Sequence, residues 1–316
     1  MSAQPSRPTR RRFLGIAATG GLAALLLACQ RSGSAAVPAP ASPLARDGGS
    51  EAVQPSPSAT TSPTPRPVPL AGRFERMLLP GTPWETPLVV AHSGRRGSAV
   101  MFLGGVHGNE PGGWLAADEV ARWQPSAGSL LVIPRANIVA TRAFERTLPD
   151  LGDLNRLYPG SLTGALPMER MAAAIIEVAT EFGIDLLIDM HESWGFFAER
   201  TQNGTAFLGQ TVTSSSGPEA ETIVPALLAI ANPRIGAGRD RLVTRDQFPL
   251  PGPSPTATPP SNAALGRGSS SLALGRFVPG LTPVLVEMGQ QDQPEDRRVA
   301  LHLEVARAAL ELRGMA

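Results

Sequence analysis

Cysteine, lysine and histidine are scarce in this chain of 316 residues. The only cysteine is Cys29, so no intrachain disulfide can form, and stability must come from an ordinary hydrophobic core, with or without a bound metal. No lysine occurs, so all 28 basic residues are arginine. Only four histidines are available as ligands or proton carriers, which makes the search for a catalytic site short.

The formal charge of +1 hides an uneven distribution. Residues 1–28 contain four arginines and no acid, so the rest of the chain has 28 − 4 = 24 arginines against 27 acids, a net charge of −3. No basic cluster occurs in the remainder. This distribution argues against nucleic acid as a partner.

The N-terminus resembles an export signal. Three arginines at residues 10–12 precede an apolar run that is too short to span a bilayer. The stretch TRRRFLG resembles a twin-arginine signal, and LLAC at residues 26–29 resembles a bacterial lipobox. We therefore expect a signal peptide over 1–29 and lipidation of Cys29. The alternative is an uncleaved N-terminal anchor, and both place the folded part outside the cytoplasm, in the cell envelope and at the membrane.

Two segments are rich in proline and small residues. Residues 30–70 contain few large apolar groups, so they cannot bury enough surface to offset their ordering entropy, and we expect a disordered tether. A second proline-rich stretch, 248–262, is expected to be a surface loop. The remaining residues, 71–316, have the size of one domain.

Apolar runs of strand length alternate with helical patterns through this domain. Buried strands are expected at 98–106, 129–134, 184–190 and 282–288, and amphipathic helices at 111–124, 166–183 and 295–314. Pro111 and Gly183 stand where helix starts and ends favour them. The alternation predicts an α/β fold with a mixed, largely parallel central sheet and helices on both faces.

The first candidate site is the segment GGVHGNEPGG, residues 104–113. His107 and Glu110 lie three residues apart after an apolar run, and imidazole and carboxylate are both zinc ligands. The alternative is a turn histidine followed by a glutamate that favours a helix N-terminus. The pattern alone does not decide between the two.

His191 also follows an apolar strand directly, in IDLLIDMHES. Two histidines and one carboxylate are a ligand set of catalytic zinc sites that leave one position for water. Asp189 could orient His191 from behind, or could be an ordinary aspartate. His92 and His302 are expected to have no part in the site.

Four further residues can complete such a site. Glu287 ends an apolar strand, where it would serve as a general base or would simply face solvent. Asn155 and Arg156, in DLNRLYPG, offer side-by-side donors that suit a carboxylate. Arg146 could stabilise an oxyanion, although any single arginine is more commonly a surface charge.

These motifs, in this order, resemble the zinc carboxypeptidase superfamily. Their residues are closest to those of its succinylglutamate desuccinylase/aspartoacylase branch. The resemblance covers residues 100–289. It implies that His107, Glu110 and His191 bind one zinc ion per chain. It further implies that Glu287 is the general base. By the same resemblance, Arg146, Asn155 and Arg156 contact the substrate.

The resemblance has two gaps. The aspartoacylase branch carries a C-terminal β-domain, but the segment after Glu287 reads as a helix. Carboxypeptidases place a mobile tyrosine over the substrate, and Tyr158, the only tyrosine, does not match that position. The expected activity is hydrolysis of an amide bond in a small substrate that bears a carboxylate, either a peptide or an N-acyl amino acid. The alternative is a tethered binding lipoprotein that has lost the chemistry.

Overall fold

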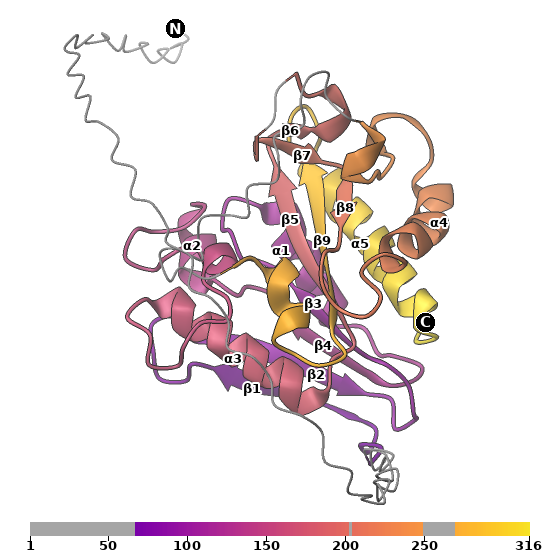
Figure 1. Cartoon of the computed structure of the whole chain (residues 1–316). Coiled ribbons are helices and arrows are strands. Elements are labelled where there is room, and N and C mark those ends of the chain that lie inside the picture. The colour runs from indigo at the N-terminus through magenta and orange to yellow at the C-terminus, as the bar shows by residue number, and fades with distance from the viewer. Residues whose placement is uncertain (1–66, 202–203, 249–268) are drawn as a thin grey trace, which may run out of the picture. The chain divides into compact units, whose positions relative to one another are not determined.

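The computed structural model describes residues 67–201, 204–248 and 269–316, which belong to one compact unit, Thr64–Ala316 (Figure 1). The predicted signal peptide with Cys29, the tether up to residue 66, and residues 249–262 of the proline-rich loop lie outside the described residues. No helix in the described part combines the length and apolar character needed to cross a bilayer.

The core of the fold is a seven-stranded sheet in the order β1-β2-β4-β3-β5-β9-β8. Its four central strands, β4, β3, β5 and β9, are parallel, whereas β1, β2 and β8 pair antiparallel at the two sides. A separate two-stranded sheet contains β6 and β7. The bounds are β1 Gly72–Leu78, β2 Thr86–His92, β3 Ala99–Leu103, β4 Ser129–Ile133, β5 Leu186–Ser193, β6 Gly195–Phe196, β7 Phe207–Gly209, β8 Thr211–Thr213 and β9 Thr282–Gly289.

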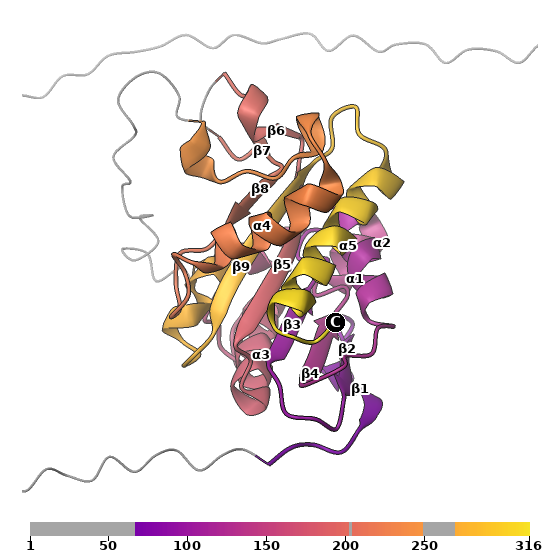
Figure 2. The ribbon, with the colours of Figure 1, turned by 90° about the vertical axis from the view of Figure 1, so that its right-hand side faces the viewer.

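Helices cover both faces of this sheet, as predicted (Figure 2). Their bounds are α1 Pro111–Val120, α2 Ile138–Ala143, α3 Pro167–Phe182, α4 Ile223–Ile235 and α5 Glu295–Leu312. The helices α1, α4 and α5 pack on one face, and α3 packs on the other. Successive residues of β3 alternate between the two cores: Phe102 joins the cluster under α1 and α5, and Met101 joins the one under α3.

The four predicted strands and three predicted helices are present, with shifted ends. Pro111 begins α1, and Gly183 ends α3 with a left-handed φ of 60°. The pattern did not predict α4, because Pro225 and Pro233 interrupt it; the first lies in the opening turn, which tolerates proline, and the second lies near the end.

The parallel strands bring the predicted site together. In the register of β5 and β9, His191 lies opposite Glu287, and β3 ends opposite Asp189 before the chain turns into the His107 loop. The carboxyl ends of parallel strands form the edge where α/β sheets bind ligands. Residues far apart in the sequence therefore meet at one edge.

Candidate metal centre and active site

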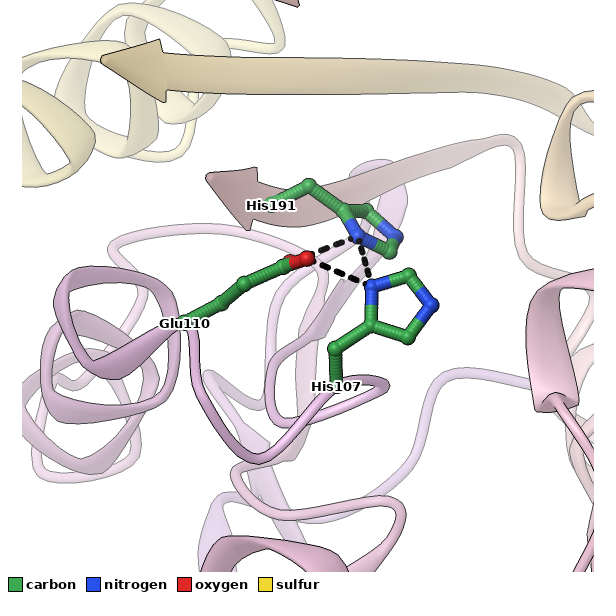
Figure 3. A group of neighbouring side chains, drawn as sticks. All are labelled: His107, Glu110 and His191. Atoms are coloured by element: carbon green, nitrogen blue, oxygen red, sulfur yellow. Dashed lines mark hydrogen bonds and ion pairs between the residues drawn. The ribbon is translucent and has the colours of Figure 1, made fainter. Parts of the chain in front are cut away.

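His107, Glu110 and His191 form a buried cluster at this edge (Figure 3). The Nδ1 atom of His107 lies 2.6 Å from Glu110 Oε1, and His191 Nδ1 lies 2.9 Å from Glu110 Oε2. The two Nδ1 atoms are 3.2 Å apart. Two residues from one loop and one from β5 thus point three ligand atoms at a common centre.

The outer nitrogens of both imidazoles face carboxylates. His107 Nε2 lies 3.2 Å from Asp153 Oδ1, and His191 Nε2 lies 2.9 Å from Asp189 Oδ2. Each carboxylate accepts a hydrogen bond from the Nε2–H of its histidine, which leaves the lone pair of each Nδ1 directed at the cluster. Asp189 therefore orients His191, which was one of two roles open for it in the sequence.

The cluster suits a divalent cation. Two neutral imidazoles with facing lone pairs repel each other unless a proton or a cation lies between them. Tetrahedral zinc with Zn–N bonds of about 2.0–2.1 Å separates its ligand atoms by roughly 3.3 Å. The separations of 2.6, 2.9 and 3.2 Å are all shorter than that value, so the side chains must move apart to accommodate the ion.

Protons compete for the same position. Burial lowers the pKa of His107, but the carboxylates of Glu110 and Asp153 outweigh it and raise the pKa above 6.5. Burial likewise opposes protonation of His191, yet Asp189 and Glu110 raise its pKa well above 6.5. Burial raises the pKa of Glu110, but the two histidines hold it well below the usual range. A metal ion must displace these protons, so its affinity should weaken as the pH falls.

Gly108, in the His107 loop, and Gly112, in the first turn of α1, make room for this arrangement. A side chain at Gly108 would collide with the backbone of Ala140, at the start of α2. A side chain at Gly112 would collide with the carboxylate of Glu192. The motif therefore requires glycine at these positions because other groups approach closely.

Glu287 faces the cluster from β9 and is 8 % exposed. Burial raises its pKa to about 7; the positive charge of His191 opposes the shift, and the carboxylate of Glu110 adds to it. Such a pKa suits a group that takes and returns protons near neutral pH. This burial excludes the alternative of a solvent-exposed strand end, and the role of general base stays a prediction.

The predicted substrate residues line the same cavity, which has a volume of about 150 Å³. Asn155 accepts a hydrogen bond from the Ser271 amide through Oδ1 (2.9 Å), which leaves its NH₂ group as a donor. Arg156 is exposed and donates to the Asn155 carbonyl (2.6 Å). Arg146 reaches Glu110 Oε1 (3.5 Å) and Asp153 Oδ2 (3.3 Å), so its guanidinium lies beside the cluster.

Sequence reasoning missed two residues of the site. Asp153 was noted only as part of a motif, yet it orients His107. Arg245 was not singled out, yet it lines the cavity with Glu287. Its segment lies against β8: Val243 bridges to Thr211, which in turn pairs with Glu287. The local sequence offered no signal for Arg245, because this residue reaches the cavity only when its segment pairs beside β8.

Glu192 is a second carboxylate in the lining of the cavity, and it has a partner of its own. Arg298 Nε donates to Glu192 Oε1 at 2.6 Å, and Gln290 Nε2 lies 3.1 Å from Oε2. Burial nevertheless raises its pKa. This ion pair ties β5 to α5 beneath the cavity.

The remaining histidines lie outside the cluster of ligand atoms. His92 ends β2 and contacts Ser129 Oγ at 2.7 Å through Nδ1. His302 is fully buried in α5, where burial lowers its pKa to about 3 and keeps it neutral. Neither belongs to the metal-ligand group, as expected.

Comparisons with known proteins agree with the motifs. Residues 96–194 match the succinylglutamate desuccinylase/aspartoacylase catalytic domain. No curated protein sequence matches the chain.

Several solved structures share the fold. Tripeptide-bound cell shape determinant Csd4 of Helicobacter pylori superposes with a TM-score of 0.54 at 16 % identity, over 70 % of this chain and 52 % of that one. A succinylglutamate desuccinylase/aspartoacylase of Rhodobacter sphaeroides gives 0.54 at 19 %, over 80 % and 68 %. Product-bound ectoine utilization protein EutE (DoeB) of Ruegeria pomeroyi gives 0.51 at 20 %, over 79 % and 70 %.

These identities establish a common fold and no more. The chain spans about half the length of Csd4. The catalytic-domain match covers the loop and the strand that supply all three metal-ligand candidates. Residues 96–194 are thus similar to the catalytic domain of the succinylglutamate desuccinylase/aspartoacylase family, and the chain shares its fold with a solved structure that carries that name.

Proposed function

We propose that the protein is an exported, zinc-dependent amide hydrolase that acts on a substrate with a free carboxylate. The observation that carries the proposal is the buried group of His107, Glu110 and His191 with Glu287 facing it across the cavity. The family that residues 96–194 match is named for two deacylases, succinylglutamate desuccinylase and aspartoacylase. Among the structures with this fold, Csd4 was solved with a bound tripeptide and EutE with a bound product. Peptides and N-acyl amino acids therefore both remain in the proposed substrate class.

His107, Glu110 and His191 would hold the ion. A bound zinc ion would supply Lewis-acid charge at the scissile carbonyl and an activated water. The chain's own residues account for the rest of the chemistry. Glu287 takes a proton from the attacking water and later delivers it to the leaving amine.

Charged and polar donors fix the substrate. Arg146, beside the cluster, offers its guanidinium to the oxyanion that forms as the carbonyl is attacked. The NH₂ group of Asn155 and the guanidinium of Arg156 hold the substrate carboxylate from the wall of the cavity. Two residues thus position the substrate, and a third stabilises charge that develops during the reaction.

Replacement of Arg156 by alanine tests this role. A charged hydrogen bond is worth about 1.5–3 kcal/mol, so KM should rise by about 10- to 150-fold for substrates with a free carboxylate. Steady-state kinetics with free and amidated forms of one substrate provide the measurement. Arg142→Ala removes an exposed arginine outside the cavity and serves as the control. An equal loss with both substrate forms would remove the anchoring role.

We further propose that the protein is located in the cell envelope. The twin-arginine-like stretch, the lipobox and Cys29 support export followed by lipid anchoring in the cell envelope. Cys29→Ala is expected to move the protein from the membrane fraction to the soluble fraction, measured by cell fractionation and immunoblotting. Cys29→Ser provides a second variant with the same loss of thioether lipidation. An unchanged membrane fraction in both would refute lipidation.

A further inference from the structure

Trp194 exposes its indole beside the catalytic cluster. It directly follows β5, which carries His191, and 57 % of its surface is exposed. Tryptophan is usually well buried, because its large apolar surface is costly to leave in water. One exposed aromatic is unremarkable on a convex surface, but Trp194 lines a hollow of about 490 Å³.

The backbone at Trp194 is firmly held. Its carbonyl accepts hydrogen bonds from the amides of Gln290 (3.2 Å) and Gln291 (2.7 Å). The preceding residue, Ser193, accepts a further bond from Gln290 through its carbonyl (2.9 Å) and donates one to Gly195 through its hydroxyl (3.2 Å). The position is therefore fixed before a ligand arrives, so binding there orders little additional backbone.

The hollow beneath Trp194 and the catalytic cavity are two lobes of one cleft. We call them the outer lobe, about 490 Å³, and the inner lobe, about 150 Å³. The residues that line both are Glu110, Arg146, Arg156, Glu192 and Thr205. Because a metal ligand and the oxyanion arginine lie on the shared wall, the reacting bond belongs at the junction.

The inner lobe takes the leaving part of the substrate. Asn155 and Glu287 line the inner lobe and are absent from the lining of the outer one. The first holds the carboxylate, and the second protonates the leaving amine. The acyl part, on the other side of the scissile bond, must then extend into the outer lobe.

The outer lobe suits a chain with its own polar groups. Asn109 and Gln290 line it beside the indole. Gln290 donates through Nε2 to the Asn109 carbonyl (2.9 Å), so its side-chain carbonyl is directed away from that bond and can accept. An aromatic platform flanked by amide donors and acceptors matches a peptide backbone, whereas acetyl or succinyl groups would leave most of the lobe filled with water.

Resting on the proposed function, we propose that the natural substrate is a peptide with at least two residues before the scissile bond, packed against Trp194. Trp194 is on this account a specificity residue. It contacts the acyl side of the substrate and takes no part in the bond cleavage. The proposal selects the peptide from the two substrate kinds left open above.

The test compares two substrate series that share each leaving amino acid X: N-acetyl-X and N-acetyl-Ala-Ala-X, with X drawn from all common amino acids. Wild-type, zinc-loaded protein should cleave the tripeptide form with at least about tenfold higher kcat/KM. Trp194→Ala should lose about 10- to 30-fold on the tripeptide form and less than twofold on the acetyl form. Trp194→Phe should retain most of the activity.

Phe144→Ala is the matched control, because Phe144 is also 57 % exposed but does not line the outer lobe. It should leave both series unchanged. Equal losses of Trp194→Ala on both series would indicate a structural role and overturn the inference, as would no loss on either. If the wild type hydrolyses the acetyl forms and Trp194→Ala changes neither series, the role of Trp194 is overturned, but the proposed amide hydrolase function stands. Cleavage of neither series by wild type would overturn both.

Discussion

Replacement of Glu287 by glutamine is expected to slow turnover by orders of magnitude while the fold and the bound metal are retained. Glutamine has nearly the same shape, but it cannot take a proton from the attacking water. General-base catalysis contributes about 10²- to 10⁴-fold, so kcat should fall by that factor with little change in KM. Single-turnover and steady-state kinetics with the best substrate of the N-acetyl-X and N-acetyl-Ala-Ala-X series give the measurement.

Glu192→Gln is the matched control, because Glu192 lines the same cavity but pairs with Arg298. It should retain much more activity than Glu287→Gln. The reverse order of the two variants would assign the base to Glu192. Substantial activity in both would exclude either carboxylate as an obligatory base.

The raised pKa of Glu287 has a consequence for stability in the metal-free protein. Its pKa of about 7 exceeds the ordinary value of 4.5, so the folded state keeps a proton that the unfolded state releases in this window. Stability therefore falls as the pH rises from about 4.5 to 7. At about 1.4 kcal/mol per pKa unit, Glu287→Gln should stabilise the metal-free protein at pH 8 by up to a few kcal/mol. Thermal melts of the wild type and Glu287→Gln in chelator at pH 4.5 and 8 check the sign of this stability difference.

Replacement of His191 by alanine is expected to remove the metal and, with it, the activity. The variant loses one of three ligands and also leaves Asp189 as a buried carboxylate without its imidazole partner. Loss of a residue that only hydrogen-bonds to a metal ligand lowers metal affinity by about 10- to 100-fold, so loss of a ligand itself should weaken metal binding further. Competition with a fluorescent zinc chelator measures the affinity.

His92→Ala is the control for this substitution, since His92 contacts Ser129 at the end of β2 and has no atom in the ligand group. It should bind zinc as the wild type does. His107→Ala should match His191→Ala. Full affinity in both ligand variants would mean that the metal binds elsewhere.

Much of the fold was predictable from local patterns. The parallel strands are continuous apolar runs because both of their faces are buried, and three helices carry clear apolar stripes between proline or glycine boundaries. The edge strand β1 and the proline-containing α4 do not show such patterns. Their form depends on pairing and packing with the rest of the domain.

The site divides in the same way. His107, Glu110, His191 and Glu287 could be found because each follows or ends an apolar strand at the edge where ligands bind. Arg245 and Trp194 could not be found so, because their relevance depends on which cavity they line. Long-range placement of loops carries that information, and no short motif encodes it.

The most direct test of the account is the metal content of the purified wild-type protein after zinc loading and gel filtration, measured by plasma mass spectrometry. The proposed function predicts close to one zinc ion per chain, held by His107, Glu110 and His191 and lost as the pH falls, because protons compete for the same atoms. A protein that stays metal-free after loading at neutral pH would contradict the assignment of a metal centre and the hydrolase mechanism built on it.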